Sequence, residues 1–259
     1  VDVGLRARQR RRQIAEARHG QRSTQGDIVA EFIADDYDAF IESAMMSTFA
    51  TNTIKIGSTV KSFTIEDAQL DITKTRVFTG QVVNSMKLEM NPNEIAKVTF
   101  GMIGKDMTVG TSVLDASITA ASGQRPIVPF TGTITEGGSA IAYVTALEMT
   151  LTNNLKSAFV VNSTTAPELI KGKARVEGQL TAYFQDTTLL NKFVNETDST
   201  LVFTLTDGVS GNTYTFTLPK IKYSGGQLPL SSDQERLLTL PFLAVYDSSE
   251  ATTLKIVKS

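Results

Sequence analysis

Two short stretches of the chain contain residue types that bind phosphate or cations in other proteins. Gly101–Lys105 combines two glycines with a lysine, but Asp106 stands where a phosphate loop needs Ser or Thr, and the glycine spacing is wrong. Asp35, Asp36 and Asp38 could hold calcium, yet the glycine and the twelfth-position glutamate of an EF-hand are missing. Capping of a helix by Asp35 or Asp36 explains this cluster better, so neither stretch predicts a ligand site.

The side chains that most enzymes use for catalysis are scarce. The 259 residues contain no Cys, which excludes a thiolate nucleophile, a disulfide framework and a Cys-based metal site. His19 is the single histidine and stands beside Gly20, where a turn residue is a better interpretation than a ligand. No serine occupies a nucleophile elbow. We therefore expect a protein that is not an enzyme and that has no metal and no other cofactor.

Composition favours a β-rich protein. The chain has 34 threonines together with many Val, Ile and Phe residues, which are typical of strands. Its 25 Lys and Arg nearly balance its 27 Asp and Glu, so we do not expect a generic polybasic binder of nucleic acid. The longest apolar runs are too short to span a bilayer, and we expect no membrane partner.

The first 25 residues form a basic segment. Seven of the eleven arginines fall within the first 22 residues. One interpretation is an arm that touches DNA, and the other is an element of the fold or of a contact between subunits. The second is favoured because no aromatic residue interleaves the arginines to stack on bases. The chain opens at Val1 without a methionine, and we expect its natural beginning to lie upstream.

Two short helices are predicted, at about 36–46 and 187–195. In the first, Tyr37, Phe40, Ile41, Ala44 and Met45 recur at helical spacing and form one apolar stripe. The second has a similar stripe after Asp186, made of Leu189, Leu190, Phe193 and Val194. We expect both stripes to pack over a sheet.

Four segments alternate apolar and polar residues, namely 86–90, 97–102, 146–152 and 175–184. Because successive side chains of a strand point to opposite faces, each segment has one apolar face for a core and one wet face. The apolar set is Leu88, Met90, Val98, Phe100, Leu147, Met149, Val176 and Leu180.

Other stretches predict hairpins and one long loop. Residues 201–206 and 213–218 flank a turn-rich connection, and 53–57 and 61–66 alternate around a short turn. Pro219 argues against a central position for whatever continues its strand. Between about 104 and 138 the periodicity weakens, which indicates a long loop that contacts a partner.

A series of short runs stands out by its order along nearly the whole chain. The runs are Arg12–Ala15, Arg18–Gly26, Tyr37–Ala44, Val60–Glu66, Arg76–Gly80, Val83–Ser85, Phe100–Asp106, Gly178–Phe184 and Leu218–Lys222. In this order they resemble the tail tube protein family of long-tailed phages, although no single run is diagnostic.

This resemblance implies a single tail tube domain over residues 1–259, with a mainly β, β-sandwich or barrel-like fold. In such tubes, hexameric rings stack into a hollow conduit, and long hairpins form the inner wall through which the genome passes. The implied partners are further copies of the chain, the tape measure, tail terminator and tail tip proteins, and viral DNA in transit. The implied location is the tail of the virion, with the host cytoplasm during assembly.

The resemblance supplies the tube, and the alternation of the strands then selects the residues. Basic residues gain affinity for DNA by releasing counterions, whereas acidic and hydroxyl residues do not. We expect a lumen lined by Glu89, Thr99, Glu148, Thr150, Glu177, Gln179 and Thr181. Lys87, Lys97 and Arg175 fit this wall only if neighbouring acids pair with them. Contacts between subunits are expected at Arg10, Arg11, Arg12, Arg125 and Pro126, and between rings at 104–138.

Two alternatives stay open on the sequence alone. The inner tube of a bacterial secretion machine would need the same smooth bore. An extracellular β-sandwich module that binds carbohydrate or another protein is less favoured, because the chain has no Trp and no signal peptide pattern.

Overall fold

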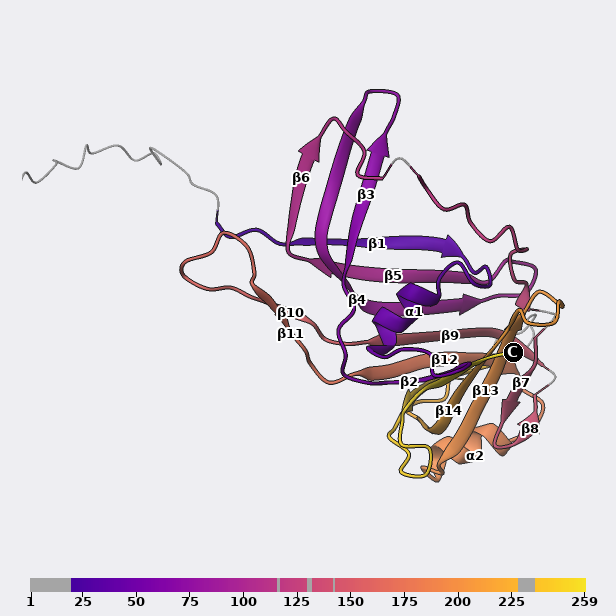
Figure 1. The fold of residues 1–259 in the computed structure, drawn as a ribbon. Coiled ribbons are helices and arrows are strands. Elements are labelled where there is room, and N and C mark those ends of the chain that lie inside the picture. Colours follow the sequence, from indigo (N-terminus) through magenta and orange to yellow (C-terminus); the bar gives the residue numbers. More distant parts are fainter. Residues whose placement is uncertain (1–19, 116, 130–131, 142, 228–235) are drawn as a thin grey trace, which may run out of the picture.

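The computed structural model describes residues 20–115, 117–129, 132–141, 143–227 and 236–259 (Figure 1). Strands dominate and the two helices are short, so the expectation of a mainly β fold is confirmed. In chain order the elements are β1 (Thr24–Glu31), α1 (Asp38–Met45), β2 (Thr53–Lys55), β3 (Phe63–Gln69), β4 (Lys74–Met90), β5 (Lys97–Gly104), β6 (Asp106–Gly110), β7 (Ile134–Glu136), β8 (Ser139–Ala140), β9 (Val144–Thr152), β10 (Lys156–Ala158), β11 (Glu168–Ile170), β12 (Arg175–Tyr183), α2 (Thr188–Val194), β13 (Ser199–Thr206), β14 (Thr213–Tyr223), β15 (Leu237–Ala244) and β16 (Lys255–Lys258).

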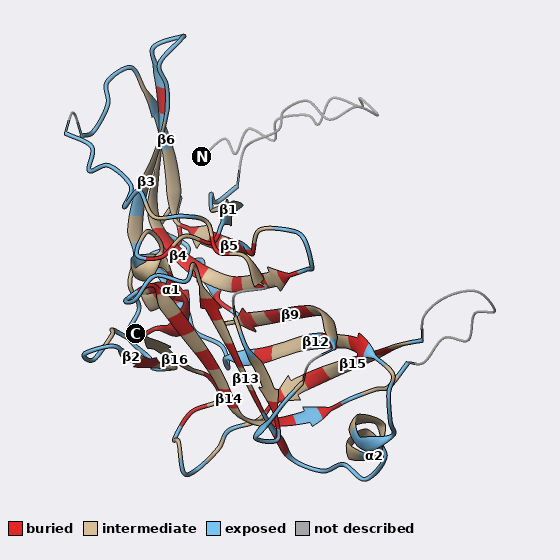
Figure 2. Ribbon diagram, turned by 90° about the vertical axis from the view of Figure 1, so that its right-hand side faces the viewer, coloured by how far each residue is buried: buried red, intermediate tan, exposed pale blue. Residues whose placement is uncertain are grey.

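Six antiparallel strands form what we call the wall sheet, in the order β1-β5-β4-β9-β12-β15. The last three residues of β14 pair with β15 and carry the hydrogen bonding into a second group of strands, which we call the cover strands: β14, β13, β7, β8, β16 and β2. Figures 1 and 2 show β13 and β14 crossing the wall strands steeply. The described strands do not close into a barrel.

One core lies between the wall sheet and the cover strands. Phe100 of the wall and Phe203 of the cover are both fully buried in the same cluster, and Phe203 stacks on Phe216 with ring centroids 4.9 Å apart. Phe32, which follows β1, packs edge-on against Tyr214 of the cover at 5.3 Å. Because the wall buries only the side chains that face this core, its other face is left to solvent.

Helix α1 packs on the wall sheet through its predicted stripe. Ile41, Ala44 and Met45 are buried, and the half-buried Phe40 stacks on Phe100 at 5.2 Å. Ser43 is also buried, and its hydroxyl donates to the carbonyl of Lys61 at 2.8 Å. The helix ends at Met46, whose left-handed backbone (φ 47°) stops the helical pattern.

The predicted capping of α1 by Asp35 or Asp36 is wrong. No side chain caps this helix, because the chain places both carboxylates in longer-range contacts. Asp36 accepts a hydrogen bond from the backbone N–H of Ser122 at 2.8 Å, and Asp35 forms an ion pair with Lys258. These contacts with distant segments replace the local cap.

Helix α2 covers the core less completely than expected. It has no buried residue, and its Leu190 and Phe193 are only partly buried against the core. A buried ion pair attaches it to the cover strands, since Lys192 Nζ lies 2.6 Å from Glu136 Oε2. Tyr223 donates to the other oxygen of Glu136 at 3.2 Å.

A three-stranded projection, which we call the arm, rises from the wall (Figure 1). It consists of β3, β6 and the part of β4 from residue 74 to 81, with β4 in the middle. Gly80 has a positive φ of 63°, a conformation that glycine adopts without strain, where β4 passes from the arm into the wall. Leu70, Ile72 and Val109 of the arm are 77, 57 and 66% exposed.

Three sequence predictions need correction. The segment 104–138 is not a loop throughout, because β4 extends far enough to pair with β6 and because β7 pairs with β13. The segments 53–57 and 61–66 do not pair with each other: β2 pairs with β16, and β3 with β4. Pro219 lies inside a central strand, at the point where β14 changes partner from β16 to β15 and its missing N–H is tolerated.

Candidate functional site: the polar face of the wall sheet

The wall sheet has one buried and one solvated face. In β4, Met86, Leu88 and Met90 are buried, while Lys87 and Glu89 between them are partly exposed. The same alternation runs along β5, β9, β12 and β15. All eight residues predicted for the apolar face are buried in the core. We call the solvated side the polar face.

Strand register arranges the polar face in three rows across the sheet. The residues predicted to line the lumen therefore lie together on one surface, with Thr181 beside these rows on β12. In the order β1, β5, β4, β9 and β12, the rows are Glu31, Lys97, Glu89, Glu148, Gln179; Val29, Thr99, Lys87, Thr150, Glu177; and Asp27, Gly101, Ser85, Thr152, Arg175.

Lys87 connects two carboxylates that would otherwise repel each other. Glu89 and Glu148 are directly opposite on neighbouring strands, a destabilising placement for like charges. Lys87 Nζ lies 2.9 Å from Glu89 Oε1 and 3.1 Å from Glu148 Oε1. The hydrogen bond to Glu89 raises the pKa of Lys87 against the opposing effect of partial burial, and Glu148 adds to the rise. The one cation in the middle of the face is thus held by two anions.

The other two cations of the polar face also have acidic partners. Arg175 contacts Glu177, two residues along the same strand, at 2.7 Å, and Lys97 contacts Glu94 at 3.4 Å. The pairing that the lumen hypothesis requires for Lys87, Lys97 and Arg175 is therefore present in all three cases. Across the three rows, five carboxylates face three cations in the described strands. The face carries net negative charge with no unpaired cation.

Strand β1 also contributes residues to this face, and these were not predicted from the sequence. Asp27 and Glu31 are exposed and belong to the same rows as the predicted residues, and Val29 between them is 67% exposed. The alternation of Asp27, Val29 and Glu31 is a weak signal, because an apolar residue stands among acids. Only the pairing of β1 with β5 places it on the polar side.

Gly178 allows the wall to pack tightly behind this face. A Cβ at Gly178 would lie 2.1 Å from the carbonyl oxygen of Glu148 and 2.5 Å from the ring of Phe242. Any larger residue would push β9 and β12 apart or displace the ring.

Of the residues expected to join subunits, only two are described. Arg10, Arg11 and Arg12 lie outside the described residues. Arg125 is exposed, and Pro126 is half-buried and forms a bridge with Ile33, just beyond the end of β1. The next residue, Ile127, is buried and exchanges backbone hydrogen bonds with Phe32 and Ala96. Arg125 therefore sits at the rim of the wall sheet on a well-anchored segment.

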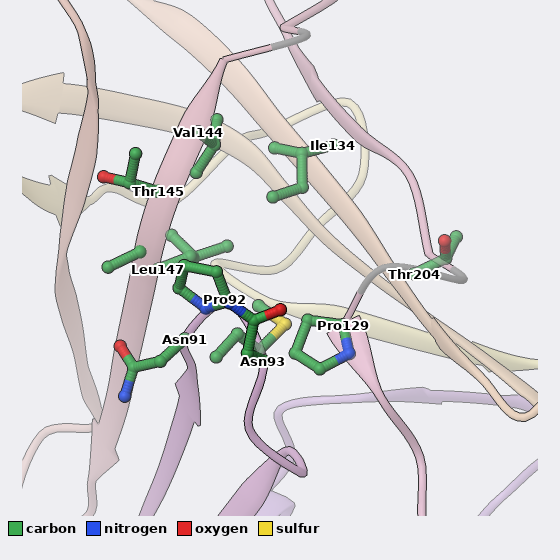
Figure 3. A pocket seen from close by; sticks show the side chains of 11 residues that line it. Asn91, Pro92, Asn93, Pro129, Ile134, Val144, Thr145, Leu147 and Thr204 are labelled. Carbon is green, nitrogen blue, oxygen red and sulfur yellow. The ribbon is translucent and has the colours of Figure 1, made fainter.

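A pocket of about 220 Å³ opens at the end of the wall where β4 finishes and β9 begins (Figure 3). Its described lining includes Met90, Pro92, Ile134 and Val144, with no acid, base or histidine. Within the described part of the chain, no group of three His, Cys, Asp or Glu could hold a metal ion. Neither described helix has the length and hydrophobicity to cross a membrane.

The polar face of the wall sheet is acidic, and each cation described on it contacts a carboxylate. A family model described as phage tail tube protein matches residues 4–244 of the 259. The chain therefore belongs to the phage tail tube protein family, a family of structural components of the virion tail. No curated protein matches its sequence.

Proposed function

We propose that this protein forms closed rings of six copies that stack into a hollow tube, and that the polar face lines the bore through which the genome leaves. The polar face carries this proposal: Glu148 is exposed on it, Glu89 and Glu177 are partly exposed, and each of its described cations contacts a carboxylate. A passing phosphate backbone meets no free lysine or arginine there, so it gains no affinity from counterion release. DNA can slide because it does not bind.

Ring closure follows from the edges of the wall sheet. On one side the sheet ends at β1, which pairs only with β5 in the described chain. An open edge of this kind exposes unpaired backbone groups, and a neighbouring copy removes that hazard. Around the ring, we propose that copies also touch through Arg10, Arg11 and Arg12, and that 104–138 with Arg125 and Pro126 contacts the next ring.

The proposed partners are further copies of the chain, other tail proteins (the tape measure, terminator and tip proteins) and DNA in transit. Assembly would take place in the host cytoplasm. The family match favours a phage tail over a secretion-machine tube or an extracellular binding module.

Reversing the charge of the bore tests this proposal. Virions that carry E89K/E148K/E177K should assemble tails of normal length but eject DNA about tenfold more slowly, and added salt should restore the rate. The matched control is E196K/D198K/E250K, which reverses three carboxylates outside the wall, the arm and the segment 104–138. Electron microscopy measures the tails, and dye release on DNA ejection measures the rate.

Two results would contradict the proposal. An unchanged ejection rate in the polar-face variant would show that the face does not meet DNA. Purified wild-type protein that forms no rings or tubes under any condition would exclude self-assembly.

A further inference from the structure

The two ends of the wall sheet differ in charge. Because the strands are antiparallel, β1 and β12 begin at the same end at which β5 and β9 finish. We call this the basic end and define it as residues 20–25, 103–106, 151–156 and 171–176. The opposite end, the acidic end, comprises residues 30–37, 89–98, 182–187 and 236–238. Figure 1 shows the basic end beside β10 and β11, and the acidic end at the tip of β1.

Cations gather at the basic end. In these four segments six of them stand against a single carboxylate, Asp106, and the exposed Glu168 of β11 lines a pocket together with Lys105 and Lys171. The six are Arg22, Lys105, Lys156, Lys171, Lys173 and Arg175. Residues 1–19, which precede this end in sequence, add six further arginines and two acids.

Carboxylates gather at the acidic end. The described residues there supply six, with two cations, Lys97 and Arg236; the anchored Arg125 adds a third cation nearby. The six are Glu31, Asp35, Asp36, Glu89, Glu94 and Asp186.

Several of these charges have no opposite charge within reach in the described chain. Lys105 and Lys171 donate only to backbone carbonyls, of Pro167 at 2.6 Å and of Ser58 at 2.8 Å. Lys156 and Lys173 are exposed, with no carboxylate within 4.0 Å among the described residues. At the other end, Glu31 is exposed and equally has no cation within that distance in the described part. Other charges at these ends do have partners within the chain, namely Arg22, Arg175, Asp35, Glu89 and Glu94. Intrachain pairing therefore accounts for only part of this distribution.

We infer that the occupant of each charged end is a second copy of this chain, so that the basic end of one copy docks on the acidic end of the copy in the next ring. The inference rests on the proposed function. If the polar face lines a bore and the β1 edge faces a neighbour in the ring, the strand ends face the rings above and below. Opposite unpaired charges on these ends are complementary, which sets partner choice and register.

The contact has a direction. A head-to-tail interface joins two different surfaces, and repetition of it builds an open filament. A ring inserted upside down would bring two basic ends or two acidic ends together, which costs free energy. All rings of one tube therefore point the same way. The segment 104–138 fits this arrangement, because it begins at Lys105 of the basic end and passes the acidic end at Ile127.

Charge reversal at each end, alone and in combination, tests the inference with the full chain. K171E/K173E removes most of the net positive charge of the basic end, and E31K/E94K cancels the net negative charge of the acidic end. Each double variant alone should raise the protein concentration needed for tube formation by about tenfold or more at low salt, where screening is weakest. An equal mixture of the two should recover tube formation, because the reversed charges of one variant can then face those of the other. The quadruple variant should also form tubes, since it reverses the charges on both sides of the contact.

The matched control is K220E/K222E, which makes the same charge change on β14, where both lysines pair with Asp198. It should form tubes like the wild type. Sedimentation and electron microscopy measure tube yield, and circular dichroism checks folding. Normal tubes from both end variants, failure of the mixture, or an equal loss in the control would overturn the inference while leaving the tube itself intact. Failure of the wild type to form rings or tubes would instead overturn the proposed function.

Discussion

Strand β4 runs through two regions in which its side chains are buried to different extents. In the wall, from Val82 to Met90, buried and solvated residues alternate toward the end of the strand, and Met86 and Leu88 are almost fully enclosed. In the arm, from Lys74 to Gly80, most residues are exposed or half-buried on both faces. Alternating residues are buried only where a second layer covers the sheet. The cover strands and α1 cover the wall, whereas α1 touches the arm only through Phe40, whose ring centroid lies 5.0 Å from that of Phe63 in β3.

The comparison shows where the fold is complete within one copy. The wall encloses its apolar residues without help. The arm leaves Leu70, Ile72 and Val109 largely in water, which single domains avoid when side chains gather on one projection. Stability should therefore depend on the wall, and assembly should draw on the arm as well.

Truncating a phenylalanine side chain in each region should give the largest difference in unfolding free energy. Phe100→Ala in the wall removes a fully buried side chain and should cost about 4 kcal/mol of unfolding free energy. Phe78→Ala removes a half-buried ring of the arm, where Arg76 lies over it, and should cost about 1 kcal/mol. Urea unfolding of the unassembled protein measures both values. Equal losses would show that the arm has a core of its own.

Replacing a glycine by alanine in each region should cost less stability than truncating a phenylalanine. We again expect the larger loss in the wall. Gly178→Ala places its Cβ against the backbone of Glu148 and should destabilise the wall by about 2–3 kcal/mol. Gly110→Ala in the arm meets only the hydroxyl of Thr75, at 3.1 Å, and no backbone atom, so it should destabilise the protein by less than about 1 kcal/mol. Thermal unfolding of the two variants under one buffer decides the point. A larger shift for Gly110→Ala would reverse our assignment of the tightly packed region.

The smallest effect is expected on the solvated face of the wall. Lys87→Met should cost about 0.5 kcal/mol, because the lysine is one-third exposed and solvent screens its two ion pairs. The pKa of Lys87 is raised in the folded state, so this contribution is complete below the usual lysine pKa of about 10.4 and is lost as pH rises through the higher folded value. The difference between variant and wild type should stay constant near neutral pH and shrink only in strong alkali. A difference that already changes near neutral pH would assign the effect to another group.

The amino-acid sequence predicts the wall better than the connections between its parts. Period-two alternation places Leu88 and Glu89 on the correct faces because it is a local property of the strand. It does not give register, so the meeting of Lys87 with Glu148 on the next strand could not be foreseen. The partner of β2 was also not predicted: β3 follows it closely in sequence, yet β2 pairs with β16 near the end of the chain, while β3 forms a hairpin with β4. Asp36 shows the same limit, because Ser122, a residue 86 positions away, takes the carboxylate that would otherwise cap α1.

The passage of one continuous strand from wall to arm has a mechanical consequence. The wall is stiff because a packed second layer resists shear, whereas the arm is a single layer of three strands that can bend about the Gly80 region. When such a tube is curved by an outside force, we expect the strain to collect in the arms while the walls keep their shape. The bore would then stay open at every ring of a bent tail, because one part of β4 bends in the arm while another part of the same strand lines the bore.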